Sequence, residues 1–310
     1  MTSDWQTRVD PEIAAALKAG RGVVALESTL IAQGLPWPEN LETARWSEAA
    51  VRASGAVPAT FAVMQGVVCV GLSAVEVERL ARSAVEGSAR VMKASRRELS
   101  GVVSRSLDAA TTVSATLWLA RRAGIGVMAT GGLGGVHRGA GETFDVSTDL
   151  DELARADGAA VVCSGVKSIL DVAATLEMLE TLGVAVVGFG ADEFPAFTTT
   201  TSGLRIDARV DTPAEAASLV RAHRALGLPG AVVLAQPVPE PVALDRGEME
   251  AALAVALREA GGLGLAGKAV TPYLLGRLAE ATAGRSLAAN TALIVNNAAL
   301  AGAVAAALAG

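Results

Sequence analysis

The sequence predicts an α/β fold with a mostly parallel central sheet flanked by helices, a small hairpin element and a helical C-terminal part. Three observations support this. Short apolar runs of strand length alternate with segments of helical periodicity along most of the chain. Two neighbouring runs joined by residues 64–66 interrupt that alternation and predict a hairpin. From about Val242 onward every segment has a helical pattern.

The first half of the chain contains both helix-start signals and buried strands. Ser73 with Glu76, and Ser95 with Glu98, have the spacing of capping boxes, so we expect a helix after each. The first should run to about residue 85. The other elements expected here, in order, are a helix at 10–19, a strand at 22–27, a helix at 39–53, hairpin strands at 59–63 and 67–71, and a helix at 108–123.

The second half continues the alternation before it becomes wholly helical. Ser168 and Asp171 resemble a capping pair that starts a helix directly after Lys167. The expected elements are strands at 125–129 and ending near 167, a helix at 168–182, a strand at 184–189, a helix at 213–226, a strand at 231–235, and helices at 246–260, 271–283 and 287–309. No low-complexity linker divides the chain, so we treat residues 1–310 as a single domain.

The composition excludes several classes of protein. Aromatic residues make up only 3% of the chain and the net charge is -6, which argues against a nucleic-acid-binding surface. Cys69 and Cys163 are too few and too far apart for a disulfide framework or a zinc cluster. The polar start shows no signal peptide, and the apolar run 298–310 is too short to span a membrane. These features lead us to expect a cytoplasmic protein without a membrane or nucleic-acid partner.

The stretch 125–167 contains the densest set of chemically useful residues. It passes from an apolar run through a glycine-rich loop to Asp145, Ser147, Thr148 and Asp149, and then through a second apolar run to Lys167. Glycines allow backbone N–H groups to approach an anion closely, and loops at the ends of parallel strands usually carry ligands. We therefore expect a small anionic ligand here.

Lysines are rare in this chain, because only four of the 26 basic residues are lysine. Arginine supplies surface charge but cannot lose a proton and attack a carbonyl, whereas lysine can. Lys167 is expected at the end of a buried strand and beside a helix start, where desolvation and the helix dipole favour a nucleophilic amine. Lys93 has a similar setting, so one amine would be the nucleophile and the other a phosphate clamp. A lysine extending to solvent is the alternative for Lys167.

Carboxylates supply candidates for proton transfer and metal binding. Glu27 ends a predicted strand and is a candidate acid or base, with a surface or helix-paired role as the alternative. Asp145 and Asp149 could both hold a hard divalent cation. Since Asp149 is also explained as a helix N-cap, we assign the metal to Asp145.

The histidines and glycines give weaker signals. His137 and Arg138 could bind an anion or orient the aspartates, although a lone histidine is more often structural. The run GGLGG at 131–135 does not fit a dinucleotide-binding fingerprint, because no acidic residue completes it. His223 lies among arginines on a predicted helix and is interpreted as a solvated surface residue.

Taken together, these motifs resemble the pseudouridine-5'-phosphate glycosidase family over about nine-tenths of the chain. The matching runs are ALESTLIAQGLPWPEN at 25–40, VPATFAVMQGVVCVGL at 57–72, KASRREL at 93–99, ATGGLGGVHRGAGETFDVSTDL at 129–150, VVCSGVKSILD at 161–171, GFGADEFPAF at 188–197, GKAVTPYLL at 267–275 and SLAANTALIVNNAAL at 286–300. Several long motifs in the same order are far more specific than any one of them.

The resemblance implies an activity and roles for individual residues. The family reversibly cleaves the C-glycosidic bond of pseudouridine 5'-phosphate to uracil and ribose 5-phosphate, with Mn²⁺ or another divalent cation, and is typically a homotrimer. By this resemblance Lys167 is the nucleophile that forms a Schiff base and Glu27 the proton donor. Asp145 binds the metal, and the substrate site is lined by Lys93, Val113, Ser147, Thr148, Asp149, His137 and Asn290.

Two other functions remain open from the residues alone. Another Schiff-base lyase or aldolase acting on a phosphosugar would need the same lysine, carboxylate and phosphate loop. A phosphosugar-sensing or scaffolding protein would keep the pocket without catalysis. Turnover of pseudouridine 5'-phosphate separates the family's reaction from both.

Overall fold

The computed structural model describes residues 5–85, 91–265 and 270–310, and its centre is an eleven-stranded sheet. The strands follow the order β1-β4-β3-β2-β7-β9-β13-β11-β12, and β6 pairs with both β3 and β5. Their bounds are β1 (Thr7–Val9), β2 (Val23–Leu26), β3 (Val57–Met64), β4 (Val67–Val70), β5 (Met92–Ala94), β6 (Ala109–Thr111), β7 (Val127–Ala129), β9 (Ala160–Cys163), β11 (Ala185–Phe189), β12 (Ala208–Val210) and β13 (Val232–Ala235).

The middle of the sheet is parallel, as predicted. Strands β3, β2, β7, β9, β13, β11 and β12 each pair in parallel with the next along this path. All residues of β2, β7, β9 and β13 are buried. A strand covered by helices on both faces needs apolar side chains at successive positions, which explains the continuous apolar runs in the sequence.

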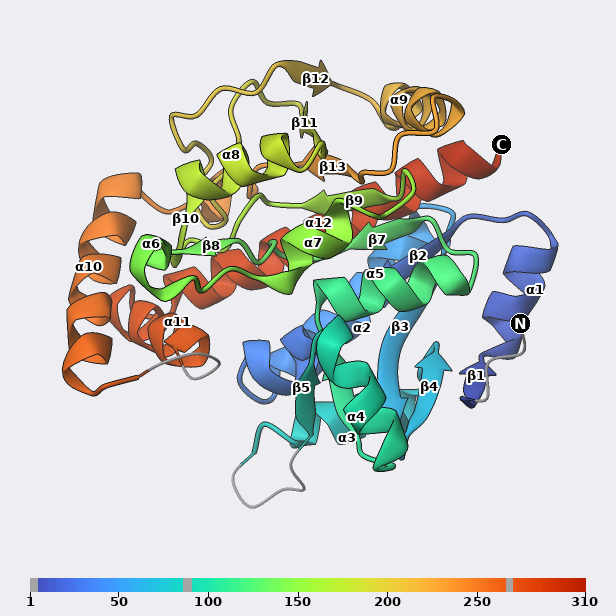
Figure 1. Ribbon diagram of the computed structural model, residues 1–310, viewed down its shortest axis with the longest axis horizontal. Helices are drawn as coiled ribbons and strands as arrows, with labels where there is room; N and C mark the ends of the chain where they lie inside the picture. The colour runs from blue at the N-terminus through green and yellow to red at the C-terminus, as the bar shows by residue number, and fades with distance from the viewer. Residues whose placement is uncertain (1–4, 86–90, 266–269) are drawn as a thin grey trace.

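Helices cover both faces of the sheet (Figure 1). One face carries α2, α9 and the long α12, and the other carries α1, α5, α7 and α8. The helices of the described chain are α1 (Pro11–Lys18), α2 (Glu39–Ala53), α3 (Ala74–Arg82), α4 (Leu99–Ser104), α5 (Val113–Arg122), α6 (Ala140–Thr143), α7 (Thr148–Leu153), α8 (Val172–Thr181), α9 (Pro213–Ala225), α10 (Arg246–Gly262), α11 (Val270–Ala281) and α12 (Arg285–Ala309), with short helical turns η1 (Leu30–Gly34), η2 (Arg96–Glu98) and η3 (Glu240–Val242).

The C-terminal helix α12 crosses behind the sheet (Figure 1) and matches the expected helix at 287–309. Its length and a window hydropathy of 1.8 would allow it to span a membrane, but half of that window is buried inside the protein. It packs along α2 and α9 and over β2, β7 and β9. Packing on the sheet therefore accounts for its apolar composition.

The predicted hairpin is confirmed. Strands β3 and β4 pair antiparallel, from Phe61 with Val70 to Met64 with Val67. The turn places Gln65 and Gly66 at φ 51° and 78°, the left-handed region that a tight two-residue hairpin turn requires.

Two predicted helices begin in the wrong place. The expected helix at 108–123 is divided into strand β6 and helix α5, which starts only at Val113. The expected helix at 168–182 starts at Val172, and Asp171 is its N-cap, accepting a hydrogen bond of 3.0 Å from the Ala174 N–H. Strand pairing overrides the local helix signals in both places, because β6 pairs with β3 and β5, and residues of β10 (Leu170–Asp171) pair with β8 (Val136–His137).

Several short elements and one side chain were not anticipated. The sequence patterns did not indicate the three-residue strands β1, β5 and β12, which are too short to show periodicity. His223, interpreted as a surface residue, is only 7% exposed. Its Nε2 lies 2.9 Å from the carbonyl oxygen of Gly230, so this histidine has a structural hydrogen bond rather than solvent contact.

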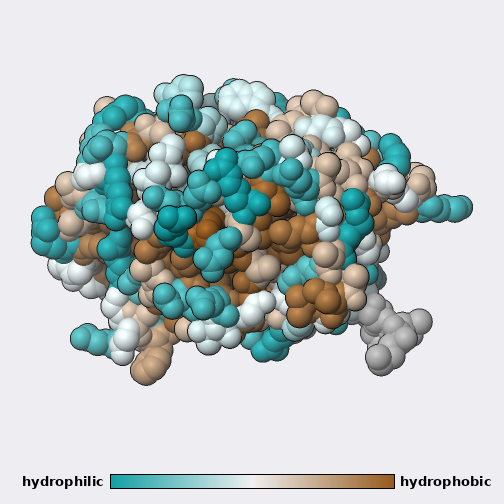
Figure 2. All heavy atoms as spheres, turned by 90° about the horizontal axis from the view of Figure 1, so that it is seen from above, coloured by the Kyte–Doolittle hydropathy of each residue, from teal (hydrophilic) through white to brown (hydrophobic). Residues whose placement is uncertain are grey.

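The surface mixes polar and apolar side chains. Figure 2 shows hydrophilic residues interspersed with apolar ones, including an apolar area near the middle of that face. A chain that is 51% hydrophobic cannot bury all of its apolar side chains.

Glu76 ties strand β1 to the start of α3 and should make the fold sensitive to acid. Its carboxylate accepts hydrogen bonds from Arg8 (2.8 Å) and from the Ser73 N–H (2.9 Å). Burial raises the pKa of Glu76, but the hydrogen bonds from Arg8 and Ser73 outweigh it and lower the pKa from 4.5 to about 2. The stabilisation is therefore complete above pH 4.5 and is lost as the pH falls toward 2.

We expect Glu76→Gln to lower the free energy of unfolding by about 1–2 kcal/mol at neutral pH. Urea denaturation of wild type and variant from neutral pH down to about pH 3 measures the difference. The gap should narrow as the pH falls. A gap that stays constant over this range would show that the carboxylate charge contributes nothing.

Candidate active site

The carboxyl ends of neighbouring parallel strands bring the candidate residues to one edge of the sheet. Glu27 directly follows β2, the Gly131–Gly132 loop follows β7, and Lys167 lies four residues beyond β9. Lys93 lies in β5, which pairs with β6. This edge is where open α/β sheets bind ligands.

Two adjoining cavities occupy this edge. The polar cavity, of about 170 Å³, is lined by residues that include Lys93, His137, Asp145, Ser147, Thr148, Asp149 and Lys167. The inner compartment, of about 60 Å³, is lined by residues that include Glu27, Lys93, Lys167 and Asn290. The two lysines line both cavities, so a ligand in the polar cavity can extend past them to Glu27.

Nearly all residues singled out from the sequence therefore lie together. The exceptions are Arg138, which lines a different cavity, and Val113, the first residue of α5, whose side chain is buried in the hydrophobic core. Its neighbour Thr112 lines the polar cavity instead. Val113 can contribute to this site only through its backbone.

Lys167 is held by pairing that continues beyond strands β7 and β9. Leu133 and Val166 form a parallel bridge, and the Lys167 N–H donates to the Leu133 carbonyl oxygen at 3.2 Å. Gly165 has φ 75°, and a Cβ there would lie 1.9 Å from the carbonyl oxygen of Pro195. The backbone thus fixes the position of Lys167. The expected helix start beside it is absent, since α8 begins at Val172, so the helix-dipole argument for Lys167 does not hold.

Glu27 is a buried carboxylate, 4% exposed, with both oxygens oriented by threonines. The Thr29 hydroxyl donates to Oε2 at 2.5 Å, and the Thr130 hydroxyl donates to Oε1. Sequence reasoning found Glu27 but missed both threonines. Thr29 lies two residues away in the same loop, whereas Thr130 comes from the end of β7 and gives no local signal.

Asn297 of α12 supports the loops that carry these groups. Its amide nitrogen donates to the carbonyl oxygens of Thr130 (2.9 Å) and Gly131 (3.3 Å), and to the Ser164 hydroxyl (3.1 Å). Its Oδ1 lies 3.3 Å from Gln236 Nε2. One fully buried side chain therefore connects the ends of β7, β9 and β13.

Asp149 has a role that the sequence did not indicate. Its Oδ1 accepts from the Ser114 N–H and its Oδ2 from the Gly134 N–H, both at 2.9 Å. Ser147, not Asp149, is the N-cap of α7, and its hydroxyl accepts from the Asp149 N–H at 3.2 Å. Asp149 thus joins the start of α5 to the glycine-rich loop on the polar cavity.

This geometry predicts that Asp149→Asn lowers the stability of the fold. An amide can offer only one acceptor oxygen, so one backbone N–H would face an NH₂ group. We expect the free energy of unfolding to fall by about 1–3 kcal/mol. Urea denaturation measures this, with the exposed Asp207→Asn as a control that should change stability by less than about 0.5 kcal/mol. Equal effects of the two substitutions would contradict this role for Asp149.

His137 and Asp145 lie side by side on the polar cavity. His137 Nδ1 is 3.8 Å from Asp145 Oδ2, and the His137 N–H donates to the Asp145 carbonyl oxygen at 3.0 Å. The Asp145 side chain is 43% exposed. Within the described ranges, no three His, Cys, Asp or Glu side chains are grouped to hold a metal. One carboxylate with a neighbouring imidazole could hold only a cation that keeps most of its waters, as Mg²⁺ and Mn²⁺ do when a ligand's oxygens complete the site.

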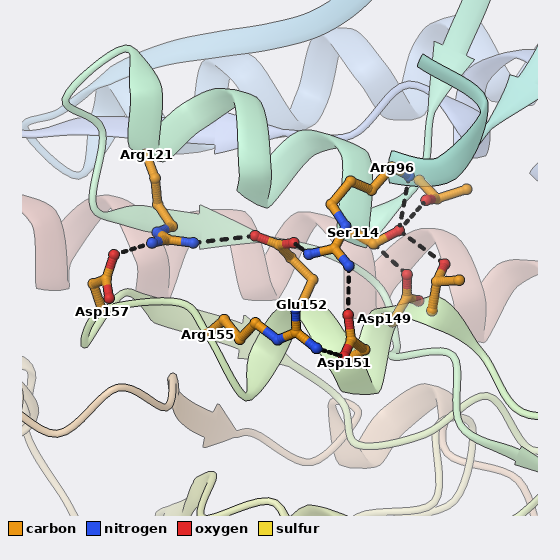
Figure 3. A network of polar contacts seen from close by, with 10 residues as sticks. Arg96, Ser114, Arg121, Asp149, Asp151, Glu152, Arg155 and Asp157 are labelled. Atoms are coloured by element: carbon orange, nitrogen blue, oxygen red, sulfur yellow. Dashed lines mark hydrogen bonds and ion pairs between the residues drawn. The ribbon is translucent and has the colours of Figure 1, made fainter. Parts of the chain in front are cut away.

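An ion-pair network lies between the turn η2, α5 and helix α7 (Figure 3). The Arg96 guanidinium binds Asp151 and, at 2.6 Å, Glu152, and Arg121 reaches the other oxygen of Glu152 at 3.2 Å. Burial raises the pKa of Glu152, and the two arginines oppose that rise. The network joins the segment after Lys93 to helix α7, which begins next to Ser147.

The nearby thiol is excluded as the nucleophile. Cys163 ends β9 close to Lys167, but burial raises the pKa of its thiol to about 12. The thiolate is the nucleophilic form, so it is essentially absent at neutral pH. Both cysteines are free and buried, in agreement with the absence of a disulfide framework expected from the sequence. An amine and a carboxyl group in a small compartment beside a polar cavity suit imine chemistry on a phosphorylated sugar.

The chain is similar in sequence to a known family and to proteins of known name. Residues 12–307 match the family described as indigoidine synthase A like protein. The chain is 54% identical to a pseudouridine-5'-phosphate glycosidase of Deinococcus radiodurans, over 96% of this chain and 93% of that protein. It is 50% identical to one of Hahella chejuensis, over 96% and 97%.

Solved structures share the fold. The prealnumycin C-glycosynthase AlnA in complex with ribulose 5-phosphate is similar with a TM-score of 0.89 at 40% identity, covering 99% of this chain and 98% of that one. An indigoidine synthase A-like protein of Thermotoga maritima is similar with a TM-score of 0.88 at 38% identity, covering 100% and 99%.

Proposed function

The chain belongs to the family of indigoidine synthase A like proteins, and we propose that within it the chain acts as a pseudouridine-5'-phosphate glycosidase. It cleaves the bond between C1' of ribose 5-phosphate and C5 of uracil, reversibly, and releases both products. One observation supports this above the others: Lys167 and Glu27 line the same inner compartment, which opens beside a polar cavity suited to a phosphosugar.

The leaving atom in this reaction is carbon, which explains the need for an amine. Two carboxylates suffice when a glycosidic oxygen leaves. Here we propose that Glu27 delivers a proton to the ribose ring oxygen, and the C1'–O4' bond breaks while positive charge at C1' is delocalised into the uracil ring. The Lys167 amine then bonds to C1' and loses a proton.

The carbon–carbon bond breaks in the next step. The electron pair of the C1'–C5 bond moves to C5, which takes up a proton, and uracil leaves. As this bond breaks, the lone pair of the Lys167 nitrogen forms a second bond to C1', which leaves the sugar bound to Lys167 as an imine. Water adds to this imine and releases ribose 5-phosphate, which restores the amine.

The remaining residues would bind and orient the substrate. Lys93 is proposed to pair with the 5'-phosphate, together with the hydroxyl groups of Ser147 and Thr148, which line the same polar cavity. His137 lines the polar cavity and Asn290 the inner compartment, and we assign neither residue to a step of the reaction. Asp145, with His137 beside it, would hold Mn²⁺ or another divalent cation, which supplies positive charge next to the substrate.

Release of uracil tests the proposal directly. Purified protein with pseudouridine 5'-phosphate and Mn²⁺ should produce uracil and ribose 5-phosphate in equal amounts, measured by chromatography. A chelator should reduce the rate, and added Mn²⁺ should restore it. If wild type releases no uracil, the proposed function is wrong. An imine formed with ribose 5-phosphate but no reverse reaction with uracil would favour a Schiff-base aldolase.

We also propose that the protein is a cytoplasmic homotrimer, as the family resemblance implies. Light scattering or sedimentation should then give three times the 31.2 kDa mass of one chain. A mass of one or two chains would contradict the trimer without affecting the chemistry.

A further inference from the structure

A third cavity adjoins the inner compartment and has no lining residue in common with the polar cavity. This outer pocket, of about 470 Å³, shares Gln33, Leu35, Phe197, Leu275 and Asn290 with the inner compartment. The two cavities therefore adjoin at these residues, and Lys167 and Glu27 line the inner one. If the sugar phosphate occupies the polar cavity, the aglycone is the part of the substrate that faces the outer pocket.

The outer pocket is larger than a single pyrimidine ring requires. A cavity of roughly 150 Å³ is enough to hold a benzene ring. The outer pocket alone has about three times that volume. A uracil ring bonded to C1' is too large for the inner compartment, of about 60 Å³, so it would extend into the outer pocket and still leave most of that pocket unfilled.

Two residues that line the outer pocket each have a buried side-chain oxygen without a hydrogen-bond partner within the described chain. The atoms are Gln33 Oε1 and Thr198 Oγ1. The Gln33 amide nitrogen donates to the Val91 carbonyl oxygen at 3.1 Å, which leaves its oxygen as a free acceptor. Thr198 is only 2% exposed. Leaving such groups unsatisfied is costly, so these two atoms indicate a ligand with polar groups of its own.

The rest of the lining is suited to a flat apolar body. Leu35, Met249, Leu278 and Leu287 supply aliphatic surface. Phe197 stands at the boundary with the inner compartment, in the left-handed region at φ 63°, which is unfavourable for a side chain of this size. Strain of this kind persists where surrounding structure enforces it, and it is concentrated at binding sites.

The position of the Phe197 ring follows from its contacts. A Cβ on Gly132 would lie 2.7 Å from the ring, so the ring packs directly on the backbone of the loop after β7. The Phe197 N–H donates to the Ser164 carbonyl oxygen at 2.9 Å, which fixes the segment. The ring thus forms a rigid wall against which a planar aglycone can pack.

We propose that the outer pocket binds the aglycone side of the substrate, and that the chain cleaves pseudouridine 5'-phosphates whose uracil ring carries a bulky planar substituent. This inference rests on the proposed function. N3 is the suitable position, because it points away from the glycosidic C5. N1 is conjugated to C5 through C6 and participates in the charge movement, so it should stay unsubstituted.

Gly276 of α11 offers a way to fill the outer pocket without disturbing the catalytic groups. It lines that pocket alone, and a Cβ there would meet no atom within 4 Å. Gly276→Phe should fold, since replacing a helical glycine favours the helix. Gly261→Phe in α10 is a matched control, because that glycine is also helical with open space around it and does not line the pocket.

The test measures kcat/KM for pseudouridine 5'-phosphate and for its N3-benzyl derivative. Wild type should process the two substrates within about tenfold of each other. Gly276→Phe should reduce kcat/KM for the benzyl substrate at least tenfold more than it reduces kcat/KM for the parent substrate, and Gly261→Phe should change neither. The inference is overturned if wild type cleaves the parent but not the benzyl substrate, or if Gly276→Phe affects both equally.

Calorimetry measures the binding of N3-benzyluracil without any turnover. This experiment therefore tests the pocket assignment independently of the proposed function. Wild type should bind N3-benzyluracil, and Gly276→Phe should weaken binding at least tenfold. Thr198→Val should weaken binding while the melting temperature stays unchanged or rises, since the hydroxyl has no partner in the free protein. Absence of binding to wild type would refute the pocket assignment, whereas binding without uracil release would refute only the proposed function.

Discussion

Lys167→Ala is expected to abolish uracil release, with kcat lower by roughly 10⁴-fold or more. In the proposed mechanism the Lys167 nitrogen bonds to C1', and the buried Cys163 thiol, which stays protonated, cannot replace it. Lys93 lines the same compartment, but its proposed role is to bind phosphate. Single-turnover measurements of uracil formation give the rate of the chemical step.

Two further variants show whether Lys167 acts as a nucleophile or only as a positive charge. Lys167→Arg keeps a positive charge but cannot form an imine, so it should be as inactive as Lys167→Ala. Lys93→Ala should mainly raise KM, since it removes a phosphate contact and leaves the nucleophile in place. If Lys167→Arg retained a substantial fraction of wild-type activity, Lys167 would act as a cation only.

Glu27→Gln is expected to lower kcat by about 10²- to 10⁴-fold, the usual contribution of a positioned acid or base. The amide has nearly the same shape, so the hydrogen bond to one threonine hydroxyl can remain while proton transfer is lost. KM should change little. The rates of uracil formation at several substrate concentrations separate the two constants.

Glu48→Gln is a matched control for this result. Glu48 is also a partly buried carboxylate whose oxygen accepts from a threonine, Thr60 at 2.6 Å, but it does not line the inner compartment. Its substitution should leave kcat within about twofold of wild type. Comparable losses for Glu27→Gln and Glu48→Gln would indicate a general effect on the fold rather than proton transfer.

The sequence predicted the central sheet because its parallel strands are buried on both faces. Strand β2 is an example: a run of apolar residues, long enough for a strand and followed by a carboxylate, placed Glu27 correctly at the sheet edge. The hairpin was also predictable, since Gln65 and Gly66 separate two runs of strand type. Both signals are local in the sequence.

The errors arise where distant contacts decide the structure. Residues 109–111 consist of alanine and threonine and continue smoothly into a helical pattern, yet they form β6 because β3 and β5 pair with them. Ser168 and Asp171 have capping-box spacing, but pairing of β10 with β8 delays the helix to Val172. The intrinsic helix propensity of a short segment is a weak effect, and strand pairing of this kind outweighs it.

Much of the site followed from the residue types and from the family resemblance. Lys167 and Lys93 could be singled out because lysine is rare in this chain, and Glu27 because it ends a predicted strand; the structure brings all three to one compartment. The role of Asp149 could not be predicted, because its partners are backbone N–H groups of Ser114 and Gly134, far away in sequence. Every residue except proline has a backbone N–H group, so hydrogen bonds to such groups leave no recognisable pattern of residue types in the sequence.

Chemical trapping of the intermediate tests the central claim, covalent catalysis by Lys167, most directly. The protein is incubated with pseudouridine 5'-phosphate and sodium borohydride, digested, and analysed by mass spectrometry. We predict one stable adduct with the mass of reduced ribose 5-phosphate, on the peptide that contains Lys167, and none in Lys167→Ala. An adduct on Lys93, or uracil release from wild type without any trapped adduct, would contradict the account.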